Sequence, residues 1–379
     1  MKILHVIDSC DPKIGGPIEG IKQLNFFYKK NKMTANLLCS NDKLDIKKFK
    51  KNLPKIYAMG SGLGKYSYNK NMFIWLKQNI DKYSVVIVHG IWQYHNYAVW
   101  KITKEKGIPY FVLPHGSLDP WFNRKYPIKF IKKYIYWNIF QHKILADSNG
   151  VLFTNKIELA LAKNSFDLTK IKKINIGYGI SGNPYKKIAL KKKKKLKKKI
   201  FLYIGRIHEK KGLDILIKSF LNILKFTSEY HLVIAGPKDT KYFKYLNSLI
   251  PKKLKSNISW PGALFNKKKW NLFNSCYVFC MPSHQENFGI SIAEALSSKK
   301  PVLTTNKVNI YKIIKKYNAG IITNDTYTSY LNGLKKFINM TDEKYINMKN
   351  NSLKCFQENF YGEKYFNNLM KYIKQEINS

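Results

Sequence analysis

Two glutamates stand eight positions apart in the segment PSHQENFGISIAEAL, residues 282–296. We predict a loop around Glu286 and a helix that carries Glu294 about two turns further on. Carboxylates accept hydrogen bonds from hydroxyl groups, so two of them at this spacing can each hold a different hydroxylated ring. Because glycine lets a backbone approach a ligand closely, three loop N–H groups are expected to face the same ligand. They belong to Asn287, Phe288 and Gly289.

A pair of cations stands in YIGRIHEKKG, residues 203–212. Arg206 follows the end of a predicted strand, and Lys211 precedes a predicted helix. Cations beside a strand end and a helix N-terminus favour an anion such as phosphate, because free N–H groups add to the side-chain charge. In so lysine-rich a chain, an ordinary charged surface is the competing interpretation.

The first half of the chain places glycines and histidines at expected strand ends. Gly15 and Gly16 follow the first strand and permit a tight turn over a phosphate or a sugar. They do not form the GxGxxG pattern of a dinucleotide site. His89 and His115 each precede a glycine at the end of a predicted strand, and we expect both to line a ligand site. A single histidine in such a position is commonly structural.

The sequence contains no Asp-x-Asp pair, and the nearest candidates, Asp42 and Asp45, stand three apart. An enzyme that binds a diphosphate through a metal needs hard oxygen ligands of this kind. We therefore expect Arg206 and Lys211 to neutralise the ligand, with no metal and no cofactor.

Short apolar runs, each followed by a longer amphipathic stretch, must position these residues. They are KILHVI, ANLLCS, VVIVHG, YFVLPHG and GVLFTN in the first half, and IFLYIG, HLVIAG, YVFCMP and PVLTT in the second. This alternation predicts βαβ units and parallel sheets, whose ligands bind at the carboxyl ends of the strands. The predicted fold class is α/β, with two doubly wound, Rossmann-like domains and a ligand cleft between them.

A lysine-rich stretch at residues 182–198 is predicted to be a solvated linker. It separates an N-terminal domain, residues 1–181, from a C-terminal domain, residues 199–355. The last segment, residues 356–379, is expected to be a helix that packs back on the first domain.

The chain of 379 residues has a formal net charge of +45. Residues 1–180 hold 30 basic and 11 acidic residues, and residues 181–379 hold 38 and 12, so both halves share the excess. A nucleic-acid-binding protein should show clustered charge instead. The five cysteines form no CxxC pair, and neither a signal peptide nor a long apolar run is evident. We therefore expect a cytoplasmic protein that does not bind nucleic acid.

Seven motifs, taken in their order, resemble the retaining glycosyltransferases of family GT4, which have the GT-B fold. They are GGP, HGIWQY, PHGSLDPW, YIGRIHEKKG, HLVIAGP, WPGAL and ENFGISIAEALSSKKPV, and the resemblance covers nearly the whole chain. It implies transfer of a sugar from a UDP- or GDP-sugar to a glycan or lipid-linked acceptor, as in surface polysaccharide biosynthesis. One departure is Phe360-Tyr361, which stands where the family often has a tryptophan.

The resemblance also implies a role for each residue. Arg206 and Lys211 match positions that bind the donor diphosphate. Glu286 matches the glutamate that holds donor-sugar hydroxyls, and Glu294 the one that holds the ribose. His115 matches the histidine near the reacting sugar, so the expected catalytic group is His115, Glu286, Arg206 and Lys211. The remaining donor-binding positions are Gly16, Gly262, Ala263, Leu264, Asn287, Phe288 and Gly289. The expected acceptor side is Gly15, Gly16, His89 and His115.

Three alternatives remain open at this stage: a GT-B sugar-nucleotide epimerase, a basic nucleic-acid-binding protein and a non-catalytic adaptor. An epimerase should lack the two glutamates in combination with the Gly-Arg and Lys-Gly pairs. An adaptor should have lost part of the set formed by Arg206, Lys211, Glu286 and Glu294. Clustered charge would favour the nucleic-acid-binding protein.

The segment PIKFIKKYIYWNIF, residues 127–140, mixes basic and aromatic side chains. Such a mixture is typical of a helix that lies at a membrane interface, so it predicts peripheral contact with an anionic membrane at the inner face of the cell. The competing interpretation is a helix whose aromatic side chains pack in the core of the first domain. The side chains concerned are Lys129, Phe130, Lys132, Lys133, Tyr134, Tyr136 and Trp137.

Overall fold

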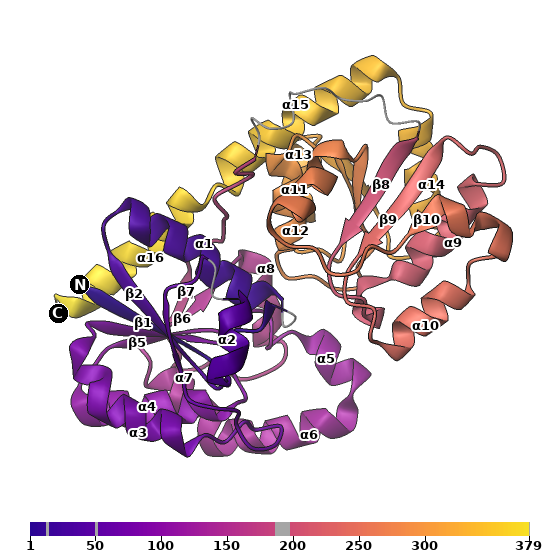
Figure 1. Ribbon diagram of the computed structural model, residues 1–379. Coiled ribbons are helices and arrows are strands. Elements are labelled where there is room, and N and C mark those ends of the chain that lie inside the picture. The colour runs from indigo at the N-terminus through magenta and orange to yellow at the C-terminus, as the bar shows by residue number, and fades with distance from the viewer. Residues whose placement is uncertain (13–14, 50–51, 186–197, 379) are drawn as a thin grey trace. The chain divides into compact units, whose positions relative to one another are not determined.

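The computed structural model describes four stretches of the chain: residues 1–12, 15–49, 52–185 and 198–378. Their contacts form two compact units. Unit 1 comprises Met1–Gly179 together with Gly362–Ser379, and unit 2 comprises Ile180–Tyr361. Each unit is a parallel sheet with flanking helices (Figure 1), as the alternation of apolar and amphipathic stretches predicted.

Unit 1 contains a seven-stranded parallel sheet in the order β3-β2-β1-β4-β5-β6-β7. The order reverses between β1 and β4, which pair side by side although two strands separate them in the sequence. The strands are β1 (Lys2–Ile7), β2 (Thr34–Cys39), β3 (Lys55–Ala58), β4 (Val85–His89), β5 (Tyr110–Leu113), β6 (Gly150–Phe153) and β7 (Lys173–Asn175). The helices are α1 (Gly16–Lys30), α2 (Lys43–Phe49), α3 (Lys70–Asn79), α4 (Tyr94–Lys106), α5 (Pro120–Lys125), α6 (Pro127–Tyr136), the π-helical turn η3 (Trp137–Gln141), α7 (His142–Ala146), α8 (Lys156–Lys163) and α16 (Gly362–Ile377).

Both faces of this sheet are buried, which explains its continuous apolar runs. Leu4 and Val6 of β1 belong to a large core cluster that includes Met72 of α3 and Val99 of α4. Ile7 belongs to a second cluster, which includes residues of α1. Because successive side chains of a strand point to opposite faces, His5 lies on the α1 side.

The end of the chain returns to unit 1 through α16, shown in yellow beside α1 in Figure 1. The Phe27 and Phe366 rings stack with centroids 5.9 Å apart. The predicted single helix from residue 356 is wrong, because α15 ends at Asn359 and α16 begins at Gly362. Phe360 interrupts it, since its side chain is buried and its carbonyl accepts the Ile180 N–H at 2.9 Å.

Unit 2 contains a six-stranded parallel sheet in the order β10-β9-β8-β11-β12-β13, with the reversal between β8 and β11. Its strands are β8 (Lys199–Ile204), β9 (Tyr230–Ala235), β10 (Ile258–Ser259), β11 (Val278–Met281), β12 (Val302–Thr305) and β13 (Gly320–Thr323). Its helices are η5 (Glu209–Lys211), α9 (Leu213–Ile223), α10 (Lys241–Ser248), α11 (Asn266–Ser275), α12 (Ile290–Ser297), α13 (Tyr311–Lys316), α14 (Tyr327–Ile338) and α15 (Asp342–Asn359).

The predicted linker at residues 182–198 belongs to unit 2 where it is described. The Asn183 side-chain amide donates to Asn274 Oδ1 at 2.8 Å and contacts Ser298 Oγ at 3.0 Å. Contacts therefore place the boundary between residues 179 and 180, not 181 and 182, because this segment packs on α11 and α12. The lysine run at residues 186–197 lies outside the described residues.

Within the described ranges, no helix combines the length and the apolar character that crossing a bilayer requires. The five cysteines are buried free thiols, and the sulfur atoms of Cys10 and Cys39 lie 3.5 Å apart.

Candidate functional site

The candidate residues of unit 2 gather where its strand order reverses. Arg206 stands two residues beyond the end of β8, and Glu286 lies in the loop that follows the neighbouring strand β11. In open α/β sheets, ligands bind outside the carboxyl ends of the two strands at such a reversal. The topology thus brings together two segments that are about 80 residues apart in sequence.

A buried ion pair joins these two segments. The Lys211 ammonium, at the end of η5, contacts Glu286 Oε2, and both side chains are mostly shielded from water. The His284 N–H also donates to the Lys210 carbonyl at 2.9 Å. The structure therefore brings Lys211 and Glu286 into direct contact, as parts of one site.

The surrounding cations keep Glu286 ionised. Burial raises the pKa of its carboxyl, but Lys211, Lys210 and Arg206 outweigh this effect and hold the pKa below its ordinary value. Arg206 itself is exposed, and its carbonyl accepts a hydrogen bond from Tyr203 Oη at 2.8 Å. Its guanidinium is thus available to an anion that approaches from solvent.

The backbone of the Glu286 loop is fixed from its other side by the segment after β12. The Glu286 N–H donates to the Lys307 carbonyl at 3.1 Å, and the Asn309 N–H donates to the Glu286 carbonyl at 3.0 Å. Because the carboxylate and its peptide groups are all held, this loop needs little reorganisation to receive a ligand.

Gly289 ends the loop with φ +73°, a left-handed conformation that favours glycine, and α12 begins at the next residue. A Cβ atom at this position would lie 3.1 Å from Ile292 Cδ1 and 3.4 Å from Glu286 Cγ. The Phe288 side chain is buried and packs edge-on against Phe360 at 5.6 Å, so only its backbone is placed to meet a ligand. Asn287 stands between Glu286 and Phe288 in this loop, with its amide oxygen 3.3 Å from Asn309 Nδ2.

The second glutamate has its own lysine, which sequence reasoning did not identify. Glu294 of α12 is 2% exposed, and its Oε1 lies 2.5 Å from Lys269 Nζ of α11. The loop of Gly262, Ala263 and Leu264 leads into α11, the helix that carries Lys269. Within the stretch NKKKW, nothing in the sequence distinguishes Lys269 from its neighbours.

The two histidines predicted in unit 1 form part of a longer buried chain of hydrogen bonds. His89 Nδ1 lies 3.0 Å from His115 Nε2, and His89 Nε2 lies 2.8 Å from His5 Nδ1. His5 Nε2 in turn lies 3.1 Å from the Tyr28 hydroxyl. The backbone at His115 has φ +52°, which an L-residue rarely adopts, and places the ring against His89.

Burial keeps these imidazoles neutral. It lowers the pKa of His5 to about 3 and that of His115 to about 4. Burial, followed by the charges of neighbouring imidazoles, also holds the pKa of His89 well below its ordinary value. Sequence reasoning missed His5 and Tyr28, although a histidine inside the apolar run KILHVI was an available signal.

The glycine pair of unit 1 opens helix α1 close to the end of β1. Gly15 has φ +94° and ψ −127°, a conformation open to glycine alone, and Gly16 has no atom within 4 Å of the position a Cβ would take. The N-terminus of α1 therefore has open space beside Gly16. Residues 13–14, which precede it, lie outside the described residues.

No group of three His, Cys, Asp or Glu side chains is arranged to hold a metal ion among the residues that the structure describes. The expectation that the protein works without a metal is not tested by this observation and stays a prediction.

Residues 185–354 match the family model described as glycosyl transferases group 1. The matched segment, a little under half of the chain, is GT4-like. The matched segment contains Arg206, Lys211, Glu286 and Glu294. It nearly coincides with unit 2, where the strand order reverses beside these residues.

Two relatives show how far the sequence similarity extends. The α-1,3/1,6-mannosyltransferase ALG2 of Dictyostelium discoideum is 28% identical over 224 residues, which cover 54% of this chain and 50% of that protein. The capsular polysaccharide biosynthesis glycosyltransferase CapM of Staphylococcus aureus is 28% identical over 141 residues, 36% of each chain. The match thus spans about half the length of the first relative and about a third of the second.

Similarity of fold extends further than similarity of sequence. Anabaena Alr3699/HepE, solved in complex with UDP and glucose, superposes with a TM-score of 0.76 over 99% of this chain and 100% of that one. Only 16% of the residues are identical. This likeness establishes the GT-B fold, with its two parallel-sheet α/β domains.

We expect Lys211→Met to lower the free energy of unfolding by about 3–5 kcal/mol, because it leaves a buried carboxylate without its partner. Chemical denaturation of unit 2 should report this loss. The control Lys238→Met removes an exposed lysine of the same unit and should cost less than about 1 kcal/mol. The double variant Lys211→Met, Glu286→Gln should regain most of the stability, and equal losses in Lys211→Met and Lys238→Met would contradict the ion pair's role.

We also expect the free energy of unfolding to fall as the pH drops from about 6.5 towards about 4, the pKa of folded His115. In this window the unfolded chain binds a proton that the folded chain excludes, so acid favours unfolding. Denaturation curves at several pH values should show a shallower loss for His115→Gln than for the wild type. Parallel pH profiles of the two proteins would show that His115 titrates normally in the folded state.

Proposed function

We propose that this protein is a retaining glycosyltransferase that moves a sugar from a nucleotide-sugar donor to a glycan or lipid-linked acceptor in surface polysaccharide biosynthesis. The observation that carries the proposal is the buried Lys211–Glu286 pair at the strand-order reversal of unit 2, beside Arg206. A diphosphate and a polyhydroxylated ring are the two chemical groups that such cations and such a carboxylate bind together.

Each part of the donor has a candidate partner in unit 2. Arg206 and Lys211 would neutralise the diphosphate, and Glu286 would accept hydrogen bonds from donor-sugar hydroxyls. Glu294 would hold the ribose, with the base against the loop of residues 262–264. The N–H groups of residues 287–289 would contact the sugar and the phosphate. Relatives support this class of donor, since HepE was solved with UDP and with UDP-glucose.

Unit 1 would supply the acceptor side, through the Gly15–Gly16 turn, His89 and His115. The naming of CapM for capsular polysaccharide biosynthesis supports an acceptor of the surface-glycan class. We assign His115 to the reacting sugar because it ends the buried histidine chain and keeps one ring nitrogen, Nδ1, without a partner among the described residues.

Retention follows most simply from a front-face displacement. The bond from the anomeric carbon to the donor phosphate oxygen breaks, and the acceptor oxygen bonds to that carbon from the same face. The acceptor proton passes to the departing phosphate oxygen. Lys211, Arg206 and the loop N–H groups would stabilise the negative charge that grows on the phosphate, so these groups supply the electrostatic part of catalysis.

The proposal is tested by a thermal-shift panel of UDP-, GDP- and ADP-sugars on the purified full-length chain, followed by mass spectrometry of the products. A true donor raises the melting temperature by mass action, because it binds only the folded state. We expect one nucleotide class to stabilise the protein and to be consumed. Stabilisation by none of the donors would count against the proposed function.

The two glutamates should differ in what they contribute. Glu294→Gln should weaken binding of free nucleotide by about 1–3 kcal/mol, because a neutral amide oxygen accepts a hydrogen bond from the ribose less strongly than a carboxylate does. Glu286→Gln should bind free nucleotide nearly as wild type does, while turnover falls. Isothermal titration measures nucleotide binding, and initial rates measure turnover. Weaker nucleotide binding by Glu286→Gln, with only turnover lowered in Glu294→Gln, would mean that Glu286 holds the ribose and Glu294 the donor sugar.

We further propose that transfer needs no divalent metal, since the cations of unit 2 can take its place at the diphosphate. Rates measured with EDTA should equal those measured without it. Loss of transfer in EDTA, with recovery on adding Mg²⁺ or Mn²⁺, would falsify this part of the proposal.

A further inference from the structure

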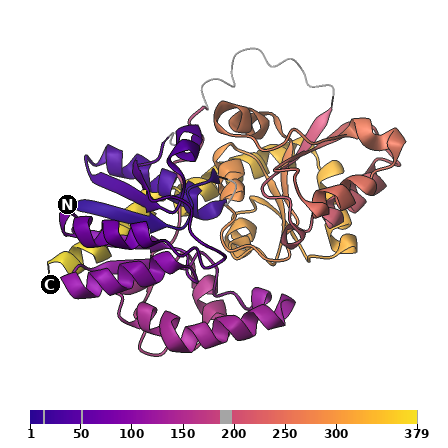
Figure 2. The same cartoon turned by 60° about the horizontal axis from the view of Figure 1, so that its bottom comes forward.

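Helix α6 exposes an apolar stripe to solvent on the outside of unit 1. None of its residues is buried, and Figures 1 and 2 show it, in magenta, at the outer edge of the unit. The stripe consists of Ile128, Ile131, Ile135 and Ile139, which are 74%, 60%, 55% and 57% exposed. Spacings of three and four residues place Ile128, Ile131 and Ile135 on one face of α6, and Ile139 follows in the π-helical turn η3.

The opposite side of α6 attaches it to unit 1. Phe130 packs against the core cluster that contains buried Trp137, and the Tyr136 hydroxyl lies 2.9 Å from the Tyr66 hydroxyl. Lys133 is half-buried, with its ammonium 5.0 Å from the centroid of the Trp92 ring. Aromatic side chains therefore pack against the first domain, as the competing interpretation predicted, but only on the side of α6 that faces unit 1. This packing does not explain why the isoleucines on the other side are exposed to solvent.

The charge around the stripe indicates what covers it. Residues 120–146 include six basic side chains and no Asp or Glu. Two of the lysines, Lys129 and Lys132, are exposed next to the isoleucines. A second copy of this chain would bring like charges together, and a nucleic acid would leave the isoleucines in water. An anionic lipid surface matches both features, since the apolar stripe enters the acyl boundary while the lysines meet the headgroups.

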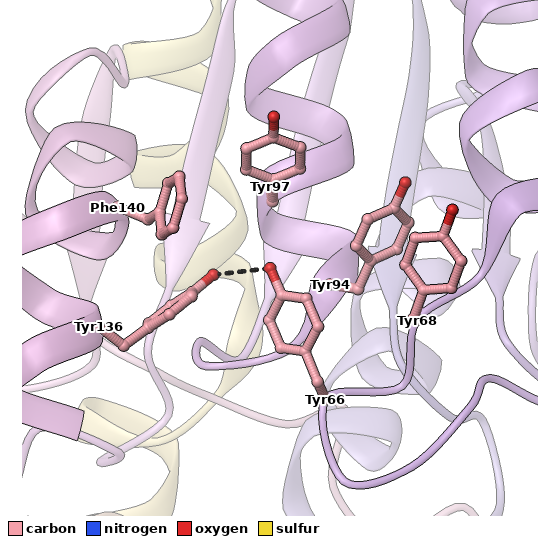
Figure 3. A pocket seen from close by; sticks show the side chains of 6 residues that line it. All are labelled: Tyr66, Tyr68, Tyr94, Tyr97, Tyr136 and Phe140. Atoms are coloured by element: carbon pink, nitrogen blue, oxygen red, sulfur yellow. Dashed lines mark hydrogen bonds between the residues drawn. The ribbon is translucent and has the colours of Figure 1, made fainter. Parts of the chain in front are cut away.

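An aromatic hollow of about 430 Å³ adjoins this helix. Figure 3 shows its six lining side chains, with the hydrogen bond between the hydroxyls of Tyr66 and Tyr136. Tyrosine rings carry an apolar body and a polar tip, and they concentrate at membrane interfaces. Phe140, 38% exposed, connects the hollow to the stripe. The lining residues are Tyr66, Tyr68, Tyr94, Tyr97, Tyr136 and Phe140.

We propose that the stripe and the aromatic hollow form one surface that docks unit 1 on an anionic lipid membrane. This inference goes beyond the proposed glycosyl transfer and is tested without any donor or acceptor. A lipid-linked acceptor would, however, meet an enzyme already held at its own membrane.

The test is flotation of the full-length protein with vesicles of phosphatidylcholine alone or mixed with phosphatidylglycerol, at low and at high salt. Wild type should float with the anionic vesicles at low salt. Lys129→Glu with Lys132→Glu should bind at least about tenfold more weakly, since each lysine near an anionic surface contributes about 1 kcal/mol. Lys133 is left unchanged because it packs on Trp92.

Matched controls separate this surface from the general positive charge of the chain. Lys315→Glu with Lys316→Glu makes the same change of charge at two exposed lysines of unit 2 and should bind like wild type. Equal losses from both lysine pairs would overturn the proposal, as would wild type that does not float with anionic vesicles.

Separate variants test the apolar residues of the surface. Ile131→Ser with Ile135→Ser should weaken binding, whereas Phe226→Ser with Ile346→Ser, exposed apolar residues of unit 2, should not. Tyr68→Ser with Phe140→Ser tests the rim of the hollow, and wild-type binding by this variant would remove the hollow from the surface. Unchanged vesicle binding by Ile131→Ser with Ile135→Ser would mean that only the lysines interact with the membrane. It would overturn the docking proposal.

A second inference concerns the histidine chain. Each neutral imidazole carries one N–H, so the contacts Tyr28–His5–His89–His115 allow only two complete arrangements. In one, Tyr28 donates and every ring passes its proton on towards His115, which then holds its proton on Nδ1. In the other, every donor points the opposite way and His115 Nδ1 is an acceptor.

We infer that Tyr28, His5 and His89 are positioning residues that set which ring nitrogen of His115 carries the proton. The inference rests on the proposed function only for its consequence, namely whether Nδ1 gives or takes a hydrogen bond at the reacting sugar. The arrangement itself is measurable without substrate, so its failure is distinct from failure of the proposed function.

The test is the nitrogen-15 NMR pattern of labelled histidine rings, which separates the two tautomers. His115 should be a single tautomer in wild type. Tyr28→Phe removes the hydroxyl that ends the chain and should shift the population, as should His5→Leu. Tyr365→Phe, another buried tyrosine of unit 1, should leave the pattern unchanged. An unaltered His115 pattern in both Tyr28→Phe and His5→Leu would overturn the inference.

Discussion

A lysine and a glutamate buried against each other, Lys211 and Glu286, join the segments that leave strands β8 and β11. Taking two charges out of water costs several kcal/mol for each ion, and apolar residues of equal volume often stabilise a fold better. The pair is therefore a poor way to stabilise the fold, compared with apolar residues of the same volume. In the proposed function its value lies in holding an ammonium and a carboxylate at fixed positions before a ligand arrives, so that binding needs little rearrangement.

The candidate site residues of the two units differ in their chemistry. In unit 2, carboxylates are matched by lysines in the Lys211–Glu286 and Lys269–Glu294 pairs. Acids are scarce in this chain, with 23 Asp and Glu against 68 Lys and Arg, so a buried carboxylate that appears here readily finds a cation. In unit 1, the corresponding sheet edge presents imidazoles that burial keeps neutral. One edge thus stabilises charge, while the other orders hydrogen bonds.

The fold class could be predicted from the sequence because the central strands are buried on both faces and appear as continuous apolar runs. The four strands that sequence reasoning missed, β3, β7, β10 and β13, are the four edge strands of the two sheets. They have two to four residues and are partly exposed, so no apolar run marks them. The helix break at Phe360 was missed although Gly362, two residues later, is the kind of residue that commonly ends a helical pattern.

For the candidate site, the sequence predicted the residues at strand ends and missed their partners. Arg206, Lys211 and Glu286 were proposed because motif and position coincide, and the structure brings Lys211 and Glu286 into contact. Lys269 and Tyr28 were not, because the contacts that give them meaning join segments 25 and 23 residues apart in sequence. The burial of single side chains depends on how helices pack on the sheet, which a local pattern does not record.

Unit 1 is discontinuous in the chain, and this order has a consequence for biosynthesis. Its sheet is complete by residue 175, but α16, which covers Phe27 and Tyr28, follows the whole of unit 2 in the chain. The ribosome therefore releases all of unit 2 before unit 1 can close its core. During that interval α1 keeps an uncovered aromatic face, and exposed apolar surface of this kind favours aggregation until α16 emerges.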